Sequence, residues 1–521
     1  MAVSAADTAS RAKAPSTPPA DHALHGRALA LVFFGLLLAM FISSLSETIA
    51  STALPTIVGD LNGVEIMQWV STAYILSSTL VMPIYGKLGD LIGRKRLLMA
   101  ALTLYAAGKV VCGLAVNMEM LISGRLISGL GGGGLIILSQ ATPSDVVPPR
   151  KLGTYMGVIG AVFAVSNVLG PLMGGWFVQV TGWRWIFWFT VPVALLAVVV
   201  LGLTLPRDAR ALGKHPIDWP GMMAMTVAVT SLVLAMAWGG TLIPWGCLPF
   251  MGLVALAVAA AMVFVLLERR AAEPIIPMGL FRNRNFVLCS VTGLFLNISF
   301  MGALNYLPTY FQIVDDLSPE VAGLVCTATS VGILITSTAT GWVASKTGRY
   351  KGMLVAMCVV STVGLFLLSR MQVHEALWVP VLYLFVLGFG MGLGMQLLVL
   401  LVQNEFPHAM VGTATAANNF FRQIGASVGT ALVGALFTMR LTADVAGKLT
   451  HVDNLSLATL TPQIVGKLPA SAQSVIAAGY SDALLPLFLW FVPLMLACLV
   501  MMLLLKRHPL ATTINHGGAG K

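Results

Sequence analysis

One carboxylate stands out in this sequence because it lies inside a long apolar stretch. Glu47 is the acidic residue placed there, whereas the other acidic residues fall in tails, turns or the ends of apolar stretches. A charge at the centre of a bilayer costs about 2.5–3.5 kcal/mol on insertion scales, so a carboxylate kept there is a candidate functional group. Burial and a nearby cation act in opposite directions on a carboxyl, so its protonation can be tuned. We predict that Glu47 binds and releases a proton; the alternative is a permanently neutral or salt-bridged core residue.

Three basic residues also lie within apolar stretches. Arg125 is the predicted partner of Glu47, because counting about 1.5 Å per helical residue places the two at similar depths. Protonation of Glu47 would weaken this pair; a fixed structural salt bridge is the alternative. Lys109 reaches a similar depth, where it either competes for Glu47, extends toward the membrane surface or packs against a neighbour. Arg422 takes either a structural role or a place in a cavity.

A charged turn, residues 86–96, separates two of the apolar stretches. It reads Gly-Lys-Leu-Gly-Asp-Leu-Ile-Gly-Arg-Lys-Arg. Gly86 and Gly93 allow close backbone approach or a sharp turn. Asp90 can meet the N-terminus of a neighbouring helix, which favours a carboxylate. The three basic residues at the end of the turn pair with Asp90 or hold the turn in the cytosol; they are Arg94, Lys95 and Arg96.

The composition indicates a polytopic all-α membrane protein. Of 521 residues, 57% are hydrophobic and 10% charged, whereas soluble domains carry about 25% charged residues. The six cysteines show no paired spacing, so we predict no disulfide framework and no metal site. The sequence also lacks a Gly-Lys-Ser/Thr phosphate loop, which excludes ATP-driven pumping by this chain alone. We therefore expect no cofactor and an ion gradient as the energy source.

Apolar runs of about 20 residues predict fourteen membrane-spanning helices. The runs lie near 28–54, 66–86, 97–116, 120–143, 152–178, 185–205, 218–238, 249–267, 286–312, 320–344, 353–369, 377–402, 411–439 and 484–505. Most of the 30 basic residues fall in the tails and alternate turns, which places both termini in the cytoplasm. This asymmetry explains the formal charge of +10, so nucleic-acid binding is not expected.

The charged turn has a degenerate copy at residues 341–351, which indicates an internal repeat. Gly341 and Gly348 match Gly86 and Gly93 in spacing, but Ser345 replaces Asp90. Parallel halves with a substrate site between them are a known transporter architecture. The predicted parts are a disordered cytoplasmic tail (1–27), a six-helix bundle (28–206), two inserted helices with cytoplasmic linkers (207–284), a second six-helix bundle (285–505) with an external loop at about 440–482, and a cytoplasmic tail (506–521).

The fifth apolar stretch is rich in glycine. Small residues allow helices to pack closely in lipid, and Pro171 removes a backbone donor and loosens the helix. We predict a packing face or hinge built from Gly157, Gly170, Pro171, Gly174 and Gly175.

These motifs resemble those of a known family. The turn at 86–96, Ala53-Leu-Pro-Thr-Ile-Val58, Arg125-Leu-Ile-Ser-Gly129 and the glycines of the fifth stretch are similar to signatures of the major facilitator superfamily. They resemble in particular its fourteen-span drug:proton antiporter branch, the group containing the EmrB and QacA exporters. The resemblance implies two six-helix bundles plus two extra central helices. One departure is that related exporters tend to carry Asp where this chain has Ser46, next to Glu47.

The resemblance also implies a function without catalysis. It predicts a bacterial plasma-membrane transporter that exports small hydrophobic or amphipathic compounds, such as multiple drugs, in exchange for protons. In this family, Arg125 is tied to proton coupling, the turn to gating and the fifth-span glycines to export. The alternative is a proton-coupled exporter specific for one metabolite, amino acid or siderophore. Partners would be small-molecule substrates and lipid, and, in a double-membraned bacterium, a periplasmic adaptor and an outer-membrane channel.

Overall fold

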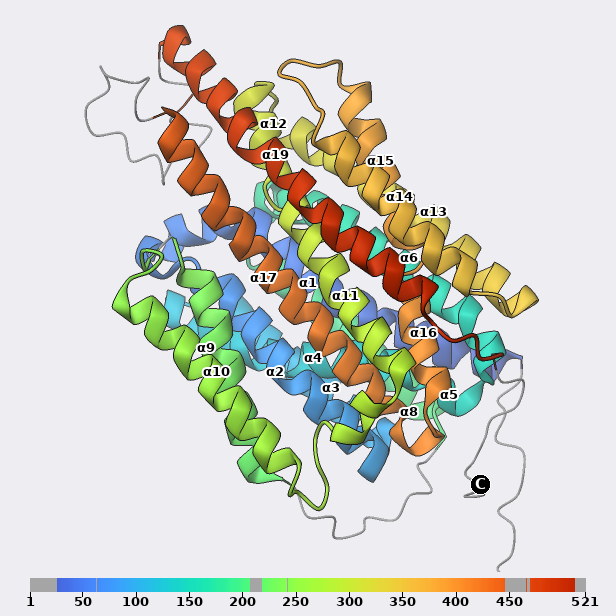
Figure 1. Cartoon of the computed structure of the whole chain (residues 1–521). Coiled ribbons are helices and arrows are strands. Elements are labelled where there is room, and N and C mark those ends of the chain that lie inside the picture. Colours follow the sequence, from blue (N-terminus) through green and yellow to red (C-terminus); the bar gives the residue numbers. More distant parts are fainter. Residues whose placement is uncertain are drawn as a thin grey trace, which may run out of the picture.

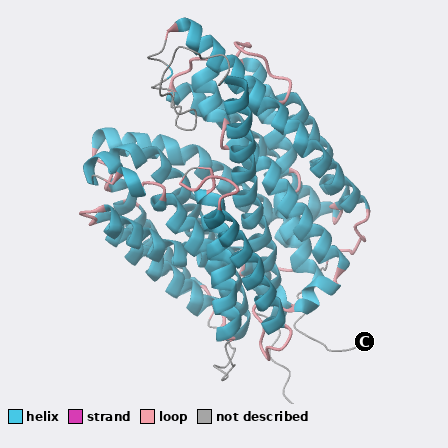
Figure 2. Ribbon diagram, turned by 60° about the vertical axis from the view of Figure 1, so that its left-hand side comes forward, coloured by secondary structure: helices cyan, strands magenta, loops and turns pink. Residues whose placement is uncertain are grey.

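The computed structural model describes residues 26–61, 63–206, 218–240, 242–445, 465 and 469–510. In this part of the chain, the secondary-structure elements are helices (Figure 2). The polytopic helical fold is therefore confirmed. The predicted disorder of the N-terminal tail falls mainly on residues 1–25, which lie outside the described residues. Residues 207–217, at the start of the predicted inserted region, and residues 511–521 also lie outside them.

The helices fall into two sets, and an inserted pair of helices lies at an outer edge of the molecule (Figure 1). The first set is α1 (Arg27–Leu61), α2 (Trp69–Ile92), α3 (Arg94–Gly113), α4 (Met118–Ala141), α5 (Pro143–Val146), α6 (Pro149–Val180), α7 (Trp185–Trp188) and α8 (Thr190–Thr204). The pair is α9 (Trp219–Trp238) and α10 (Leu248–Glu268). The second set is α11 (Arg284–Leu304), α12 (Leu307–Val314), α13 (Pro319–Thr347), α14 (Lys351–Leu368), α15 (Trp378–Gly392), α16 (Met395–Glu405), α17 (Val411–Val445) and α19 (Ala470–Leu503). Short 3₁₀ turns occupy Val64–Ile66, Met278–Arg282 and His408–Met410.

Thirteen helical segments in the described residues are long and apolar enough to cross a membrane. Helix α2 is not one of them, although its 24 residues give it the required length. Its predicted span is interrupted by hydroxyl side chains, among them Thr72, Ser77 and Ser78, which are buried against other helices. The predicted span at residues 66–86 is thus present as α2, a helix of moderate polarity inside the first set.

Two predicted boundaries are wrong. Helix α1 does not stop at residue 54 but continues through Pro55 to Leu61. The external loop predicted at about 440–482 is shorter, because α17 runs to Val445 and α19 begins at Ala470. The start of α19 is too polar to be recognised as apolar, yet it buries Ile476 and Tyr480 on one face. Residues 446–464 and 466–468 of this loop lie outside the described part of the chain.

Two pairs of helices make the main contacts between the two sets, and α6 also contacts α16 and α4 contacts α17. Helix α2 packs on α17, and α6 packs on α13. The inserted α9 and α10 pack on each other, and α9 also packs on α2. In Figure 2 the two lobes of helices approach each other toward the end of the molecule that carries the C-terminus and diverge toward the opposite end. The contacts between the two sets therefore gather at one end.

Candidate functional site

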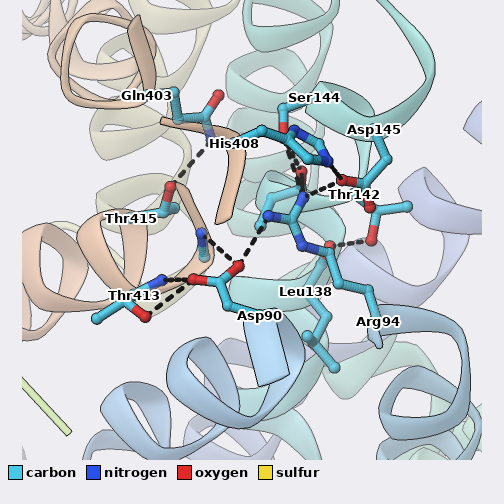
Figure 3. Close-up of polar contacts among 12 residues, drawn as sticks. Asp90, Arg94, Leu138, Thr142, Ser144, Asp145, Gln403, His408, Thr413 and Thr415 are labelled. Atoms are coloured by element: carbon cyan, nitrogen blue, oxygen red, sulfur yellow. Dashed lines mark hydrogen bonds and ion pairs between the residues drawn. The ribbon is translucent and has the colours of Figure 1, made fainter. Parts of the chain in front are cut away.

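Asp90 joins α2 to the first turn of α17 (Figure 3). Its Oδ1 accepts the backbone N–H of Gly412 at 3.0 Å, and its Oδ2 accepts the N–H and hydroxyl of Thr413 at 2.7 and 2.9 Å. The first N–H groups of a helix have no intrahelical partner and carry partial positive charge, which a carboxylate satisfies. The helix N-terminus that Asp90 reaches thus belongs to the other half of the protein.

Arg94 holds Asp90 in place from the start of α3. Gly93 turns the chain between α2 and α3 with a φ of 99°, a conformation that favours glycine. Arg94 is 1% exposed; its Nη2 lies 3.0 Å from Asp90 Oδ1, and its Nη1 lies 2.9 Å from both Ser144 Oγ and Asp145 Oδ1. A guanidinium presents five donors in a fixed fork, which suits such a junction. The charged turn is therefore packed inside the protein.

The sequence reasoning missed two residues of this junction, Asp145 and His408. Nε2 of His408 lies 2.9 Å from Asp145 Oδ1, so the turn before α17 is tied to α5 (Figure 3). A signal was present in the sequence: residues 403–410, at a predicted cytoplasmic turn, contain no Lys or Arg. Glu405 in this turn accepts hydrogen bonds from Asn283 and Asn285 at 3.1 and 2.7 Å. This turn packs against protein and does not serve as a charged anchor.

The other basic residues of the charged turn have different surroundings. Lys95 Nζ donates to carbonyl groups at the end of α8, including Gly202 O at 2.8 Å. Lys351 Nζ does the same at the end of α19, where Leu503 O lies 2.6 Å away. Lys351 lies ten residues after Gly341, as Arg96 lies after Gly86, but its contacts match those of Lys95. Arg96 is exposed.

The degenerate copy of the turn makes a corresponding contact without charge. Ser345 Oγ, near the end of α13, accepts the backbone N–H of Thr154 at 2.8 Å and its hydroxyl at 3.0 Å. Thr154 lies in the first turns of α6. Arg150 Nε also donates to the Ser345 carbonyl at 3.3 Å. The α13–α6 contact therefore repeats the α2–α17 contact, with a hydroxyl where the first has a carboxylate.

Repeat-related glycines bring the backbones together at both contacts. A methyl group added at Gly86 would lie 2.7 Å from the carbonyl oxygen of Gly412. One added at Gly341 would lie 2.4 Å from the carbonyl oxygen of Gly153. Both distances are shorter than van der Waals contact, so only glycine fits. Together, these two helix–helix contacts form the closed end of the molecule.

The glycines of α6 face two different helices. A methyl group at Gly157 would lie 2.6 Å from Ser337 O on α13, in the other half. Methyl groups at Gly170 and Gly174 would lie 2.0 and 2.1 Å from the hydroxyls of Thr48 and Thr52 on α1. One end of α6 therefore packs across the two halves, and the other end packs beside Glu47.

The remaining members of the glycine motif do not share this packing. A methyl group at Gly175 would meet nothing within 4 Å, and the side chain of Pro171 is exposed on α6. The sequence pattern therefore combines positions that need glycine with one that has room for a side chain.

This difference gives a test within the motif. In the exporter that the motifs imply, we expect Gly157→Ala to lower the transport rate about tenfold or more, because the added methyl group clashes with backbone and separates α6 from α13. Gly175→Ala should keep most of the rate, since the position is open and Ala favours the helix by about 1 kcal/mol. Uptake of ethidium into everted vesicles measures both. Equal rates in the two variants would contradict a role for the α6–α13 contact in transport.

Arg125 is buried against α1, but its partner there is Ser46. Its Nε donates to Val70 O at 2.9 Å, and its Nη1 donates to Ser46 O at 3.0 Å and Ser46 Oγ at 3.2 Å. The guanidinium lies 4.5 Å from the centre of the Tyr74 ring. Glu47, the next residue, is exposed. The two predicted partners thus lie at the same level of the bundle, and their pairing stays a prediction.

Lys109 also turns inward. Its side chain is 0% exposed, and its Nζ is hydrogen-bonded to Ser46 Oγ. The rings of Tyr105, Phe187 and Tyr74 surround it at 5.0, 5.3 and 5.8 Å. The alternative in which Lys109 extends to the membrane surface is therefore wrong, because tight packing of α3 on α4 directs it into the bundle.

Arg422 lies in a polar connection between the two halves. Its Nη1 donates to Asn419 Oδ1 at 3.2 Å, and Asn419 Nδ2 donates to Gln140 Oε1 on α4 at 2.8 Å. Gln403 Nε2 reaches the Gln140 carbonyl at 2.9 Å. These contacts place Arg422 next to the closed end. Among the described residues, no group of three or more metal-ligating side chains is present.

The protein has two helical halves that are joined by repeat-related contacts, and many of its helices are long and apolar enough to cross a membrane. These features define a multi-pass membrane transporter fold. The chain belongs to the Major Facilitator Superfamily, whose family model matches residues 36–430. The resemblance inferred from the motifs is thereby confirmed.

Similar proteins agree with this assignment. The chain is 38% identical over 502 residues to an uncharacterised MFS-type transporter, Rv1877 of Mycobacterium tuberculosis, covering 95% of this chain and 73% of the relative. It is 34% identical over 454 residues to the multidrug transporter protein MdtP of Bacillus subtilis, covering 87% of this chain and 84% of MdtP. The crystal structure of the human organic anion transporter MFSD10 (TETRAN) shares the fold, with a TM-score of 0.61 at 15% identity over 92% of this chain and 100% of that one.

Proposed function

We propose that this transporter exports small hydrophobic or amphipathic compounds, including drugs, in exchange for protons. The observation that carries the proposal is Glu47: an exposed carboxylate halfway along a membrane-spanning helix, next to Ser46, which is hydrogen-bonded to the buried basic side chains of Lys109 and Arg125. An exposed carboxyl group near a buried cation is suited to bind and release a proton. Similarity to the multidrug transporter MdtP supports the choice of cargo.

The proposed cycle uses the closed end as its cytoplasmic gate. Both termini would lie in the cytoplasm of a cell-membrane protein, because basic residues gather on that side. With the Asp90 contact closed, substrate leaves and protons enter from outside. Protonation of Glu47 then weakens its attraction to Arg125 and lets the two halves rock to open the cytoplasmic side.

Replacing Glu47 tests this proposal. We expect Glu47→Gln to remove proton-coupled ethidium transport in everted vesicles, because the amide keeps the shape but cannot exchange a proton. Proton release on addition of ethidium to energised vesicles measures the coupling. The control is Glu119→Gln, which removes another exposed carboxylate, at the first turn of α4. Proton release at the wild-type level in Glu47→Gln would refute the coupling.

A panel of unrelated dyes, cations and drugs separates broad export from export of one solute. Competition with ethidium by several unrelated compounds supports the multidrug proposal. A transporter for a single metabolite, amino acid or siderophore would ignore most of the panel.

A further inference from the structure

Two buried cationic side chains meet at one neutral hydroxyl in the first bundle. Lys109 and Ser46 are 0% exposed and Arg125 is 1% exposed. Both basic side chains are hydrogen-bonded to Ser46 Oγ. Among the described residues, no carboxylate forms an ion pair with either of them. Buried charges in proteins are normally paired, so this arrangement requires an explanation.

Glu47 attracts Arg125 electrostatically, but no carboxyl group in the described part of the chain faces Lys109. Helices α7 and α8 contribute no titratable residue to this contact. The hydroxyl of Tyr105 donates to Ile42 O at 2.6 Å, so this phenol remains protonated. The groups that face Lys109 are Ser46 from α1, Tyr74 from α2, Arg125 from α4, Phe187 from α7, and Tyr105 and Cys112 from α3.

The hydrogen-bonding capacities of Arg125, Lys109 and Ser46 indicate which of the two basic side chains is uncharged. Arginine has only donors and stays protonated in proteins, so Arg125 keeps its charge. A serine hydroxyl has one hydrogen and two acceptor sites. If Lys109 is an uncharged amine, Ser46 accepts from Arg125 and donates its own hydrogen to the Lys109 lone pair. All three groups are then satisfied without two like charges on one oxygen.

We propose that Lys109 is a second proton-binding residue of this transporter, uncharged while it shares Ser46 with Arg125 and protonated during the cycle. The proton enters from the exposed side of α1, where Glu47 follows Ser46, and reaches Lys109 through intervening water. One O–H bond of the donating acid breaks as a new N–H bond forms on Lys109, which leaves the ammonium and the conjugate base of that acid. The role of this step in export rests on the proposed proton coupling.

Titration of the purified full chain in detergent tests the charge of Lys109 without any transport. From the lowest pH at which the chain stays folded up to pH 9, wild type should release about one proton more per chain than Lys109→Met, whereas ordinary lysines titrate near pH 10.4. The control, Lys151→Met, removes an exposed lysine of α6 and should superimpose on wild type. Superposition of the Lys109→Met and wild-type curves would overturn the proposal.

A second pair of variants tests whether Lys109 is uncharged because no carboxylate faces it. Ser46→Asp gives both cations a carboxylate, so Lys109 should keep its proton throughout this pH range. The titration curves of Ser46→Asp and Ser46→Asp/Lys109→Met should then coincide. A difference of about one proton that persists in this background would show that the missing carboxylate is not the reason.

Transport then decides whether the second site is used. Lys109→Arg keeps the size and charge of the side chain but cannot release a proton. We expect it to lose pH-gradient-driven ethidium export while it still binds ethidium; export at the wild-type rate would overturn the role in the cycle. If wild type itself shows no coupling to a pH gradient, the proposed function fails, and the titration still decides the charge of Lys109.

Discussion

Replacing Asp90 by Asn should lower ethidium export at least tenfold, the largest effect expected from any single change at the closed end. Asn has nearly the same shape, but its amide nitrogen cannot accept a hydrogen bond from Gly412, Thr413 or Arg94. Breaking a buried ion pair by removing one partner costs about 3–5 kcal/mol. Asp90 and Arg94 have side chains 3% and 1% exposed, but Arg94 keeps Asp145 as a partner, so we expect a cost at the lower end of this range. The cost falls on the closed state, because α17 contacts Asp90 through its first turn.

The matched control is Ser345→Ala in the repeat-related contact. It removes two neutral hydrogen bonds with Thr154, each of about 1 kcal/mol, and it leaves no buried charge unpaired. We expect export to fall only a few-fold. Initial rates in everted vesicles, normalised to protein in the membrane, compare the two variants. Equal losses would mean that both turns only anchor the protein in the membrane, and the asymmetry would have no functional meaning.

Much of the fold was predictable because lipid imposes simple rules on sequence. Apolar runs marked the crossing helices, and basic turns marked one side of the membrane. The prediction failed at the start of α19, where one face is polar and Ile476 and Tyr480 are buried on the other. Mean hydropathy averages over both faces of a helix. It therefore does not identify a helix that has one polar face and one face buried against protein.

The type of site could be predicted from the sequence, but the residues that contact Asp90 and Arg125 could not. A carboxylate in a glycine turn indicated a helix N-terminus, yet Asp90 and Gly412 are 322 residues apart, and nothing local identifies α17. Similarly, Ser46 and Glu47 lie about 100° apart on α1, and the sequence does not say which faces inward. That rotation follows from packing: Gly170 and Gly174 on α6 receive Thr48 and Thr52 of α1. Ser46 is then directed at Arg125, and Glu47 is left exposed.

This orientation of α1 makes Arg125 the second residue at which we expect a large effect. Arg125→Lys keeps a positive charge, but a single ammonium lacks the guanidinium fork and cannot reach Val70 O and Ser46 at once. Each lost hydrogen bond from a charged donor costs about 1.5–3 kcal/mol. We therefore expect Arg125→Lys to lower the thermal stability in detergent by several degrees and to reduce ethidium export at least tenfold.

The control for Arg125 is another buried arginine with fewer bonds. Arg422 is 7% exposed and donates one hydrogen bond to a side chain, that of Asn419. An ammonium can replace that single bond, so Arg422→Lys should keep most of the stability and most of the export. If both variants behave alike, any buried positive charge suffices, and the contacts of Arg125 with Ser46 and Val70 do not position α1. If only Arg125→Lys fails, the geometry of the guanidinium matters, because it fixes which side chain of α1 meets Lys109 and which meets water.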